Sequence, residues 1–330
     1  MMAWAIFVAS SALIVLAAVK LAEYGDAIAV RTRLGGMFIG TLLLAAATSL
    51  PELLTTVSSL DQNSPNLAAG NLFGSGMANM LFLALLELFT LRFYILRRIG
   101  MRHTLTAALG IMLTGMVVFY LMADIDVRIG WVGLDSLSVM VAYLVGFRLL
   151  QSGHAGHTTP SEATADEVQV PGLVKSVIGF VIATAVLVIV TPHLVSSSIS
   201  ISEQTGIRAG FIGAALVAFT TSLPELVTVI AAARLGAYDL AVGNLFGSNL
   251  FNMFALGLTD VFYTDGRFLG RIDLSFGLVG MLVILMTTLG LIGSLSRSER
   301  KLFFVKVDAI LLILIYMGGM FLLYTKGIGL

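Results

Sequence analysis

The sequence predicts an all-α membrane protein of ten transmembrane helices, arranged as two inverted repeats of five. The first observation behind this prediction is composition: 58% of the 330 residues are hydrophobic, 12% are charged, and the mean hydropathy is +0.99. A soluble protein carries about 25% charged residues. The chain therefore has the composition of membrane crossings of roughly 20 residues each. The zero net charge gives no indication of a basic surface that would bind nucleic acid. The chain contains no cysteine, which excludes disulfides and thiolate metal sites.

The second observation is an internal repeat. Residues 37–80 and 210–253 align without a gap at an offset of 173 residues, and 22 of the 44 positions are identical. Both copies contain TSLPEL followed by GNLFGS, and each places one glutamate, Glu52 or Glu225, in a strongly apolar stretch. An ionisable residue within a membrane segment is a functional-site hypothesis by default. A repeat centred on such a residue indicates a symmetric ion site in a membrane transporter.

The third observation is the spacing of the apolar segments, of which five precede and five follow the polar stretch 151–170. An odd number of crossings reverses the starting face, so the two halves enter the membrane from opposite sides as inverted repeats. We assign 1–150 to the first repeat, 151–171 to a linker and 172–330 to the second repeat. The ten predicted segments are 3–22, 35–60, 67–90, 103–123, 129–150, 172–194, 207–233, 240–261, 274–294 and 304–324.

The basic residues predict how these segments are oriented. Lysine and arginine concentrate in cytoplasmic loops. Of the 19 in this chain, 14 fall on the side that holds the linker, so we expect 151–171 in the cytoplasm and both termini outside a plasma or inner membrane. No basic region precedes the apolar run 3–20, which favours a first helix over a cleaved signal. The five basic residues on the opposite side are Arg128, Arg208, Arg267, Arg271 and Lys326.

Each repeated TSLPEL motif places a proline and a threonine beside its glutamate. Pro51 and Pro224 cannot donate to the helix ladder, and each ring collides with the carbonyl four residues back. Carbonyls freed in this way within a membrane need another partner, which a cation can provide. Thr48 and Thr221 lie one turn before the glutamates, so hydroxyl and carboxylate share a helix face.

The helix after each glutamate carries a stripe of three polar residues spaced four apart. With the glutamates and threonines, these stripes supply the carboxylate, hydroxyl, amide and carbonyl oxygens that Ca²⁺ takes in sets of about 6–8. Zn²⁺ and copper prefer histidine or cysteine ligands instead. Small and polar residues also hold membrane helices together by close packing and interhelical hydrogen bonds, so helix packing remains an alternative role for the stripes. They consist of Asn71, Ser75 and Asn79 in the first repeat and Asn244, Ser248 and Asn252 in the second.

Four further acidic residues fall close to predicted helix ends. We expect them at the membrane interface rather than in an ion site, because a charge at the bilayer centre costs about 2.5–3.5 kcal/mol even on insertion scales. They are Glu23, Glu87, Asp260 and Asp308.

At these motifs the chain resembles the cation/calcium exchanger family, and in particular its prokaryotic sodium/calcium exchangers. The resemblance covers both repeats, each with a TSLPE helix followed by a GNxxGSxxxN helix, and it agrees with ten helices and external termini. It implies that segments 3–22 and 172–194 slide across a rigid core. It implies Ca²⁺ ligands at Thr48, Glu52, Thr221 and Glu225. It implies Na⁺ or supporting ligands at Ala45, Ser49, Ser75, Asn79, Ala218, Ser222, Ser248 and Asn252.

The chain departs from the family pattern in two places. The family's GSN becomes GSG at 74–76, whereas 247–249 retains GSN. Asn252 stands where some members, among them potassium-dependent ones, carry an aspartate. A third position bears on the coupling ion: proton-coupled relatives have a glutamate where this chain has Gly74 and Gly247, which favours Na⁺.

These features predict a cofactor-free secondary antiporter that exchanges Ca²⁺ for Na⁺ by alternating access at a central site of two glutamates. Ca²⁺/H⁺ exchange is the alternative, because two protons neutralise two ionised glutamates as one Ca²⁺ does. Three Na⁺ would instead leave one positive charge and make exchange voltage-sensitive. A membrane-embedded enzyme with paired glutamates as acid and base is a hypothesis from another class. The sequence offers it no candidate nucleophile–base pair.

Overall fold

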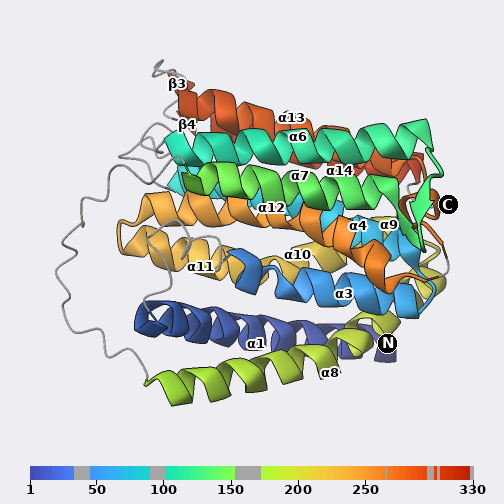
Figure 1. Ribbon diagram of the computed structural model, residues 1–330, viewed down its shortest axis with the longest axis horizontal. Coiled ribbons are helices and arrows are strands. Elements are labelled where there is room, and N and C mark those ends of the chain that lie inside the picture. The colour runs from blue at the N-terminus through green and yellow to red at the C-terminus, as the bar shows by residue number, and fades with distance from the viewer. Residues whose placement is uncertain are drawn as a thin grey trace.

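The computed structural model describes residues 1–32, 45–89, 101–152, 172–264, 266–295, 301–302 and 305–327. Most of these residues are helical, and the helices run nearly side by side in one bundle (Figure 1). The first half comprises α1 (Met2–Thr32), α3 (Leu50–Asp61), α4 (Pro65–Phe89), α6 (Met101–Ala123), β1 (Arg128–Ile129), β2 (Val132–Gly133) and α7 (Leu134–Ser152). The second half comprises α8 (Leu173–Thr205), α9 (Ala209–Ile212), η1 (Gly213–Val217), α10 (Ala218–Thr221), α11 (Leu223–Arg234), α12 (Tyr238–Phe262), η2 (Phe268–Gly270), α13 (Phe276–Leu295), β3 (Lys301–Leu302), β4 (Val305–Lys306) and α14 (Val307–Lys326).

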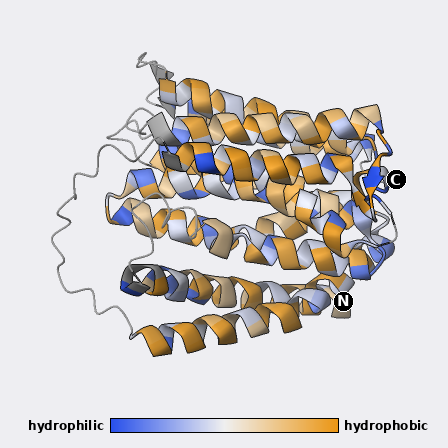
Figure 2. Cartoon of the chain, viewed as in Figure 1, coloured by the Kyte–Doolittle hydropathy of each residue, from blue (hydrophilic) through white to orange (hydrophobic). Residues whose placement is uncertain are grey.

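Seven helical spans in the described part of the chain are long and apolar enough to cross a membrane. Apolar residues cover much of the helices, most evidently α8 (Figure 2). The predicted second, fifth and eighth segments, which contain α3, α7 and α12, are not among the seven. Part of the second segment, 35–44, and most of the linker, 153–171, lie outside the described residues. The helical membrane character is confirmed, whereas the count of ten crossings stays a prediction.

The two helices that carry the polar stripes, α4 and α12, lie at the centre of the bundle. Every residue from Leu67 to Met80 in α4 and from Ala241 to Leu250 in α12 is buried. A helix that is covered on all sides is a core helix rather than a lipid-facing one. The main apolar core surrounds this pair and includes side chains from α6, α7, α11, α13 and α14.

Helices α1 and α8 form a second layer against this core. They lie alongside each other and run in opposite directions, as Figure 1 shows. Their buried side chains, among them Ile14, Leu21, Leu187 and Leu194, make up an apolar cluster separate from the main one. The two helices therefore pack chiefly against each other while sharing a smaller boundary with the rest of the bundle.

Both described chain ends lie at one end of the bundle, here called the termini end, opposite the end where α7 finishes and α8 begins (Figure 1). The five basic residues predicted for a common side gather at the termini end. Arg128, Arg267 and Arg271 line one cavity of about 320 Å³ there. Arg208 donates to the carbonyl of Gly327, and it lines a second cavity with Lys326.

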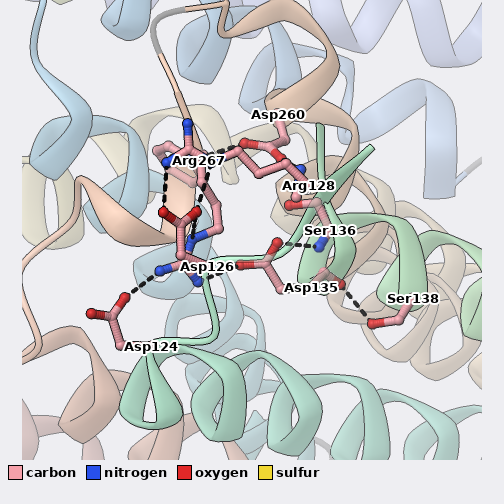
Figure 3. A network of polar contacts seen from close by, with 10 residues as sticks. Asp124, Asp126, Arg128, Asp135, Ser136, Ser138, Asp260 and Arg267 are labelled. Carbon is pink, nitrogen blue, oxygen red and sulfur yellow. Dashed lines mark hydrogen bonds and ion pairs between the residues drawn. The ribbon is translucent and has the colours of Figure 1, made fainter. Parts of the chain in front are cut away.

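A network of charged residues fastens the two halves together at the termini end (Figure 3). The buried Arg267 guanidinium donates to Asp135 over 3.0 Å, and it also pairs with Asp124. Arg128 donates twice to Asp126, and this contact holds the pKa of the Asp126 carboxyl below its ordinary value. Arg267 follows α12, whereas Asp124 follows α6 and Asp135 lies in the first turn of α7, so the network crosses from one repeat to the other.

The residues before α7 correct one predicted boundary. The fifth segment was expected to begin at 129, but Arg128–Ile129 pairs antiparallel with Val132–Gly133, and the helix starts only at Leu134. Gly130 adopts a φ of +69° in this turn, a conformation that glycine tolerates without steric cost. The tight hairpin therefore replaces the first turn of the predicted helix.

Two of the acidic residues expected at the membrane interface are buried within the protein. Glu87 pairs with Lys306 over 3.0 Å. Asp260 accepts hydrogen bonds from the backbone N–H groups of Gly133 and Phe268 over 2.6 and 2.5 Å. Both lie near helix ends as predicted, but polar partners from neighbouring elements compensate their burial. Hydropathy cannot reveal such partners, because they come from distant parts of the chain.

Candidate cation-binding site

Each TSLPEL motif interrupts a helix beside its glutamate. Residues 45–48 are helical, Ser49 forms a turn, and α3 begins at Leu50 with Pro51 as its second residue. The second repeat does the same: α10 ends at Thr221 and α11 starts after Ser222. Proline is tolerated at the start of a helix, where its missing N–H leaves no broken hydrogen bond. The breaks place both glutamates in the first turn of a new helix.

Each glutamate accepts a hydrogen bond from a serine of the other repeat. Ser49 Oγ donates to Glu225 Oε1 over 3.1 Å, and Ser222 Oγ donates to Glu52 Oε1 over 3.0 Å. A serine at an N-cap ordinarily binds the backbone of its own helix, but neither serine makes a side-chain cap bond. The two hydroxyls instead join the helix breaks reciprocally, which brings the predicted residues of both motifs into one site.

The carboxylates of this site are buried without a counter-charge. Glu52 and Glu225 have no exposed surface, and no ion pair between described residues involves either of them. Ionised carboxylates in a low-dielectric interior are costly unless paired or bound to a cation. The second oxygen of each, Oε2, has no hydrogen-bond partner in the described structure. The arrangement therefore suits a bound cation or protons.

The threonines of the motifs reach the polar stripes across the repeat boundary. Thr221 Oγ1 donates to Asn71 Oδ1 over 3.0 Å, and Thr48 Oγ1 makes the equivalent, longer contact of 3.5 Å with Asn244 Oδ1. Asn71 also donates to the backbone carbonyl of Glu52 over 3.0 Å. The first stripe is thus in direct contact with both helix breaks.

The predicted backbone ligands, Ala45 and Ala218, already accept hydrogen bonds. The Ala45 carbonyl accepts from Thr48 Oγ1 over 3.1 Å and from the Ser49 N–H over 3.0 Å. The Ala218 carbonyl accepts from Thr221 Oγ1 over 3.3 Å, and from the following serine N–H over 3.0 Å. A carbonyl oxygen has two lone pairs. Each threonine hydroxyl has a single proton, which lies within reach of both this carbonyl and an asparagine Oδ1 of the stripes. When the hydroxyl donates to the asparagine, one lone pair of the carbonyl is available for a cation.

Several further polar atoms of the stripes are buried without a partner among the described residues. Ser248 donates to Glu225 Oε1 over 3.4 Å, whereas its counterpart Ser75 has no partner. Buried polar atoms are almost always hydrogen-bonded, so a cluster of exceptions indicates that water or an ion binds there. The unpartnered atoms in this region are Glu52 Oε2, Glu225 Oε2, Ser75 Oγ, Asn79 Oδ1, Asn244 Nδ2, and Oδ1 and Nδ2 of Asn252.

Glycines allow the α4 backbone to lie directly on the helix that precedes Glu225. A Cβ at Gly70 would stand 2.3 Å from the carbonyl oxygen of Gly210, and a Cβ at Gly74 would stand 2.6 Å from the Cα of Ala214. No side chain fits at such distances. Gly70 and Gly74, which are spaced as a GxxxG pair, therefore serve helix packing.

Two residues of this region were not singled out from the sequence as site residues. Thr56 accepts a hydrogen bond from Asn71 Nδ2 over 3.2 Å, and Asn249 bonds to Asn79 and to the backbone of Gly76. Both are positions where the two repeats differ, since Val229 and Gly76 stand at the equivalent places. The difference between positions 76 and 249, next to the site serines, is visible in the sequence and is the signal that could have identified Asn249.

Comparisons with known proteins bear on this geometry. A family described as "Sodium/calcium exchanger protein" matches residues 2–149 and 175–325. The sodium/calcium exchanger MaX1 of Methanosarcina acetivorans is 28% identical over 68% of this chain and 73% of its own length. The putative antiporter CaxA of Alkalimonas amylolytica is 26% identical over 92% of this chain and 93% of its own length.

Solved structures show a similar fold. Native YfkE superimposes with a TM-score of 0.69 at 18% identity, covering 97% of this chain and 91% of its own. The sodium-calcium exchanger NCX_Mj gives 0.62 at 22% identity, with 97% and 98% covered. The H⁺/Ca²⁺ exchanger CAX gives 0.65 at 12% identity, with 98% and 89% covered. At these identities the likeness concerns the fold.

Proposed function

Because the chain belongs to the sodium/calcium exchanger protein family, we propose that it is an antiporter that moves Ca²⁺ out of the cell in exchange for Na⁺. The observation that carries the proposal is the pair of buried glutamates, each bound by a serine of the other repeat and without a counter-charge among the described residues. Carboxylate and hydroxyl oxygens are the ligands that Ca²⁺ prefers. The protein acts as a membrane transporter without a cofactor, rather than as an enzyme.

Ca²⁺ binds between the TSLPEL motifs in this proposal, with Thr48, Glu52, Thr221 and Glu225 as its ligands. Na⁺ is held by the same carboxylates together with neutral oxygens around them. Those supporting residues are Ala45, Ser49, Ser75, Asn79, Ala218, Ser222, Ser248 and Asn252. The unpartnered oxygens of Ser75 and Asn79 support this assignment, because they are buried on the central helix α4 and have no other use in the described structure.

Ca²⁺/H⁺ exchange at the same glutamates is the second candidate. Two protons would neutralise the buried carboxylates as one Ca²⁺ does, and an H⁺/Ca²⁺ exchanger shares the fold. Against it stands the absence of a further acidic residue at Gly74 and Gly247, where proton-coupled relatives carry a glutamate. Three Na⁺ per Ca²⁺ would carry one net charge, worth about 2.3 kcal/mol per 100 mV, so exchange would respond to voltage.

Flux measurements test the coupling ion directly. Purified protein in proteoliposomes is loaded with radioactive Ca²⁺, and the Na⁺ and pH gradients are imposed separately at clamped voltage. Efflux driven by Na⁺ alone supports the proposal. Efflux driven by the pH gradient, with none driven by Na⁺ at constant pH, would replace it with Ca²⁺/H⁺ exchange. Absence of Ca²⁺ flux under every gradient would reject both.

The membrane arrangement that we propose is two inverted five-helix repeats, 1–150 and 172–330, joined by a cytoplasmic linker at 151–171. The antiparallel α1 and α8 support it, and so does the gathering at the termini end of the five basic residues predicted for one side. The chain contains no cysteine, so a single introduced cysteine reports its own position. Thr325→Cys should react with an impermeant maleimide from outside the cell, and Leu173→Cys only after the membrane is opened. The reverse pattern would invert the topology.

A further inference from the structure

We infer that Asn249 is a positioning residue, which turns the amide oxygen of Asn79 toward the proposed cation site. The inference rests on the proposed function and adds a residue outside its ligand set. It starts from a difference between the repeats at the residue that follows the site serine. Gly76 follows Ser75 in α4, whereas Asn249 follows Ser248 in α12.

A backbone carbonyl fixes the orientation of two side-chain amides in series. The Gly76 carbonyl can only accept, so the atom of Asn249 that faces it over 3.3 Å must be Nδ2. Oδ1 of Asn249 then faces the other way and accepts from Asn79 Nδ2 over 2.9 Å. With its nitrogen committed to Asn249, Asn79 keeps its oxygen for a different partner.

That oxygen has no partner in the described structure, although Asn79 is 99% buried. A buried acceptor left unsatisfied is costly. Asn79 lies one helical turn after Ser75, so both belong to the stripe whose first member, Asn71, touches the helix breaks. Two unsatisfied oxygens on one face of a central helix are suited to a cation, which compensates both.

The second repeat lacks this device. Asn252 is the counterpart of Asn79, and neither its oxygen nor its nitrogen has a partner among the described residues. The residue that would orient it is Gly76, where a Cβ would stand 3.2 Å from both methyl groups of Val283. Packing against Val283 of α13 thus leaves too little space for a side chain at position 76 unless Val283 shifts. In the first repeat, the hydrogen bond from Asn79 to Asn249 fixes which end of the Asn79 amide faces the site. In the second repeat, no such bond fixes Asn252, so either its oxygen or its nitrogen can face the site.

A double-mutant cycle tests the inference by measuring Na⁺ affinity from the rise in melting temperature with Na⁺ concentration at constant ionic strength. Asn249→Leu removes both hydrogen bonds at similar side-chain volume. We expect it to weaken Na⁺ binding about tenfold. In an Asn79→Ala background the same change should have less than about a twofold effect, because Asn249 acts only through Asn79.

Thr259→Val is the matched control, since it removes a buried hydrogen bond from the same helix α12 away from the site. It should lower the melting temperature without Na⁺ but leave Na⁺ affinity unchanged. Asn249→Ala carries the test if the leucine variant does not fold. Unchanged affinity, equal losses in both backgrounds, or failure of both variants to fold would overturn the inference. A wild-type protein that Na⁺ does not stabilise would instead overturn the proposed exchange for Na⁺.

Discussion

Glu52→Gln is the substitution that probes the proposed site most directly, because it changes charge while keeping shape. The amide oxygen of the new side chain can still accept the hydrogen bond that Ser222 donates to Glu52 over 3.0 Å. No ion pair of the described structure is lost, since none involves this glutamate. We therefore expect the ion-free protein to fold normally, with an unchanged or raised melting temperature.

The loss of Ca²⁺ binding should be large. Two unit charges 4 Å apart attract by about 4 kcal/mol at an effective dielectric constant of 20. A divalent cation doubles this to about 8 kcal/mol. If the neutral amide oxygen recovers half of that attraction, about 4 kcal/mol remains lost, which weakens binding roughly 10³-fold. Glu225→Gln should behave in the same way, because its carboxylate is equally buried and is bound by Ser49.

The assay is uptake of radioactive Ca²⁺ by proteoliposomes, together with the Ca²⁺-dependent rise in melting temperature. Glu23→Gln is the matched control, because Glu23 is an exposed glutamate that pairs with Lys20 on α1. It should transport like the wild type, whereas both site variants should show no uptake. If either site variant is folded in the membrane and transports at a near wild-type rate, the reasoning from the buried carboxylates is wrong.

Three further predictions follow from individual contacts. Transport should need no K⁺, because Asn252 replaces the aspartate of potassium-dependent relatives; strong stimulation by K⁺ at constant voltage would contradict this. Gly74→Ala should destabilise the protein by about 1–3 kcal/mol, since its Cβ would meet the backbone of η1, whereas Gly110→Ala, which meets nothing within 4 Å, should not; thermal unfolding distinguishes them. Arg267→Met should cost about 3–5 kcal/mol in the same measurement, because it leaves the fully buried Asp135 without its cation. Arg128→Met, at an exposed ion pair, should change little, and equal effects of the two would refute that reasoning.

The local features of this protein could be predicted from its sequence, because they depend on residues close together in the chain. Hydropathy indicated the helices, and each proline indicated the break that the structure places beside Glu52 and Glu225. The repeat also identified which residues are equivalent. A membrane segment reveals its own length and polarity, since the lipid it must cross acts on each segment separately.

The contacts that build the site were decided only by the tertiary structure. Ser49 and Glu225 are 176 positions apart, and neither motif alone shows that its serine would bind the opposite carboxylate rather than cap its own helix. The buried pairs of Glu87 with Lys306 and of Arg267 with Asp135 depend likewise on elements that meet only in the folded bundle.

The repeat predicted symmetry, and the structure decided where symmetry ends. Asn249 reaches across to Asn79, whereas Val283 occupies the space that a side chain at Gly76 would need. A repeated sequence determines that two segments have the same local conformation. It does not determine that their neighbours are the same, because each side chain packs against helices from outside the repeat, and those helices differ between the two halves.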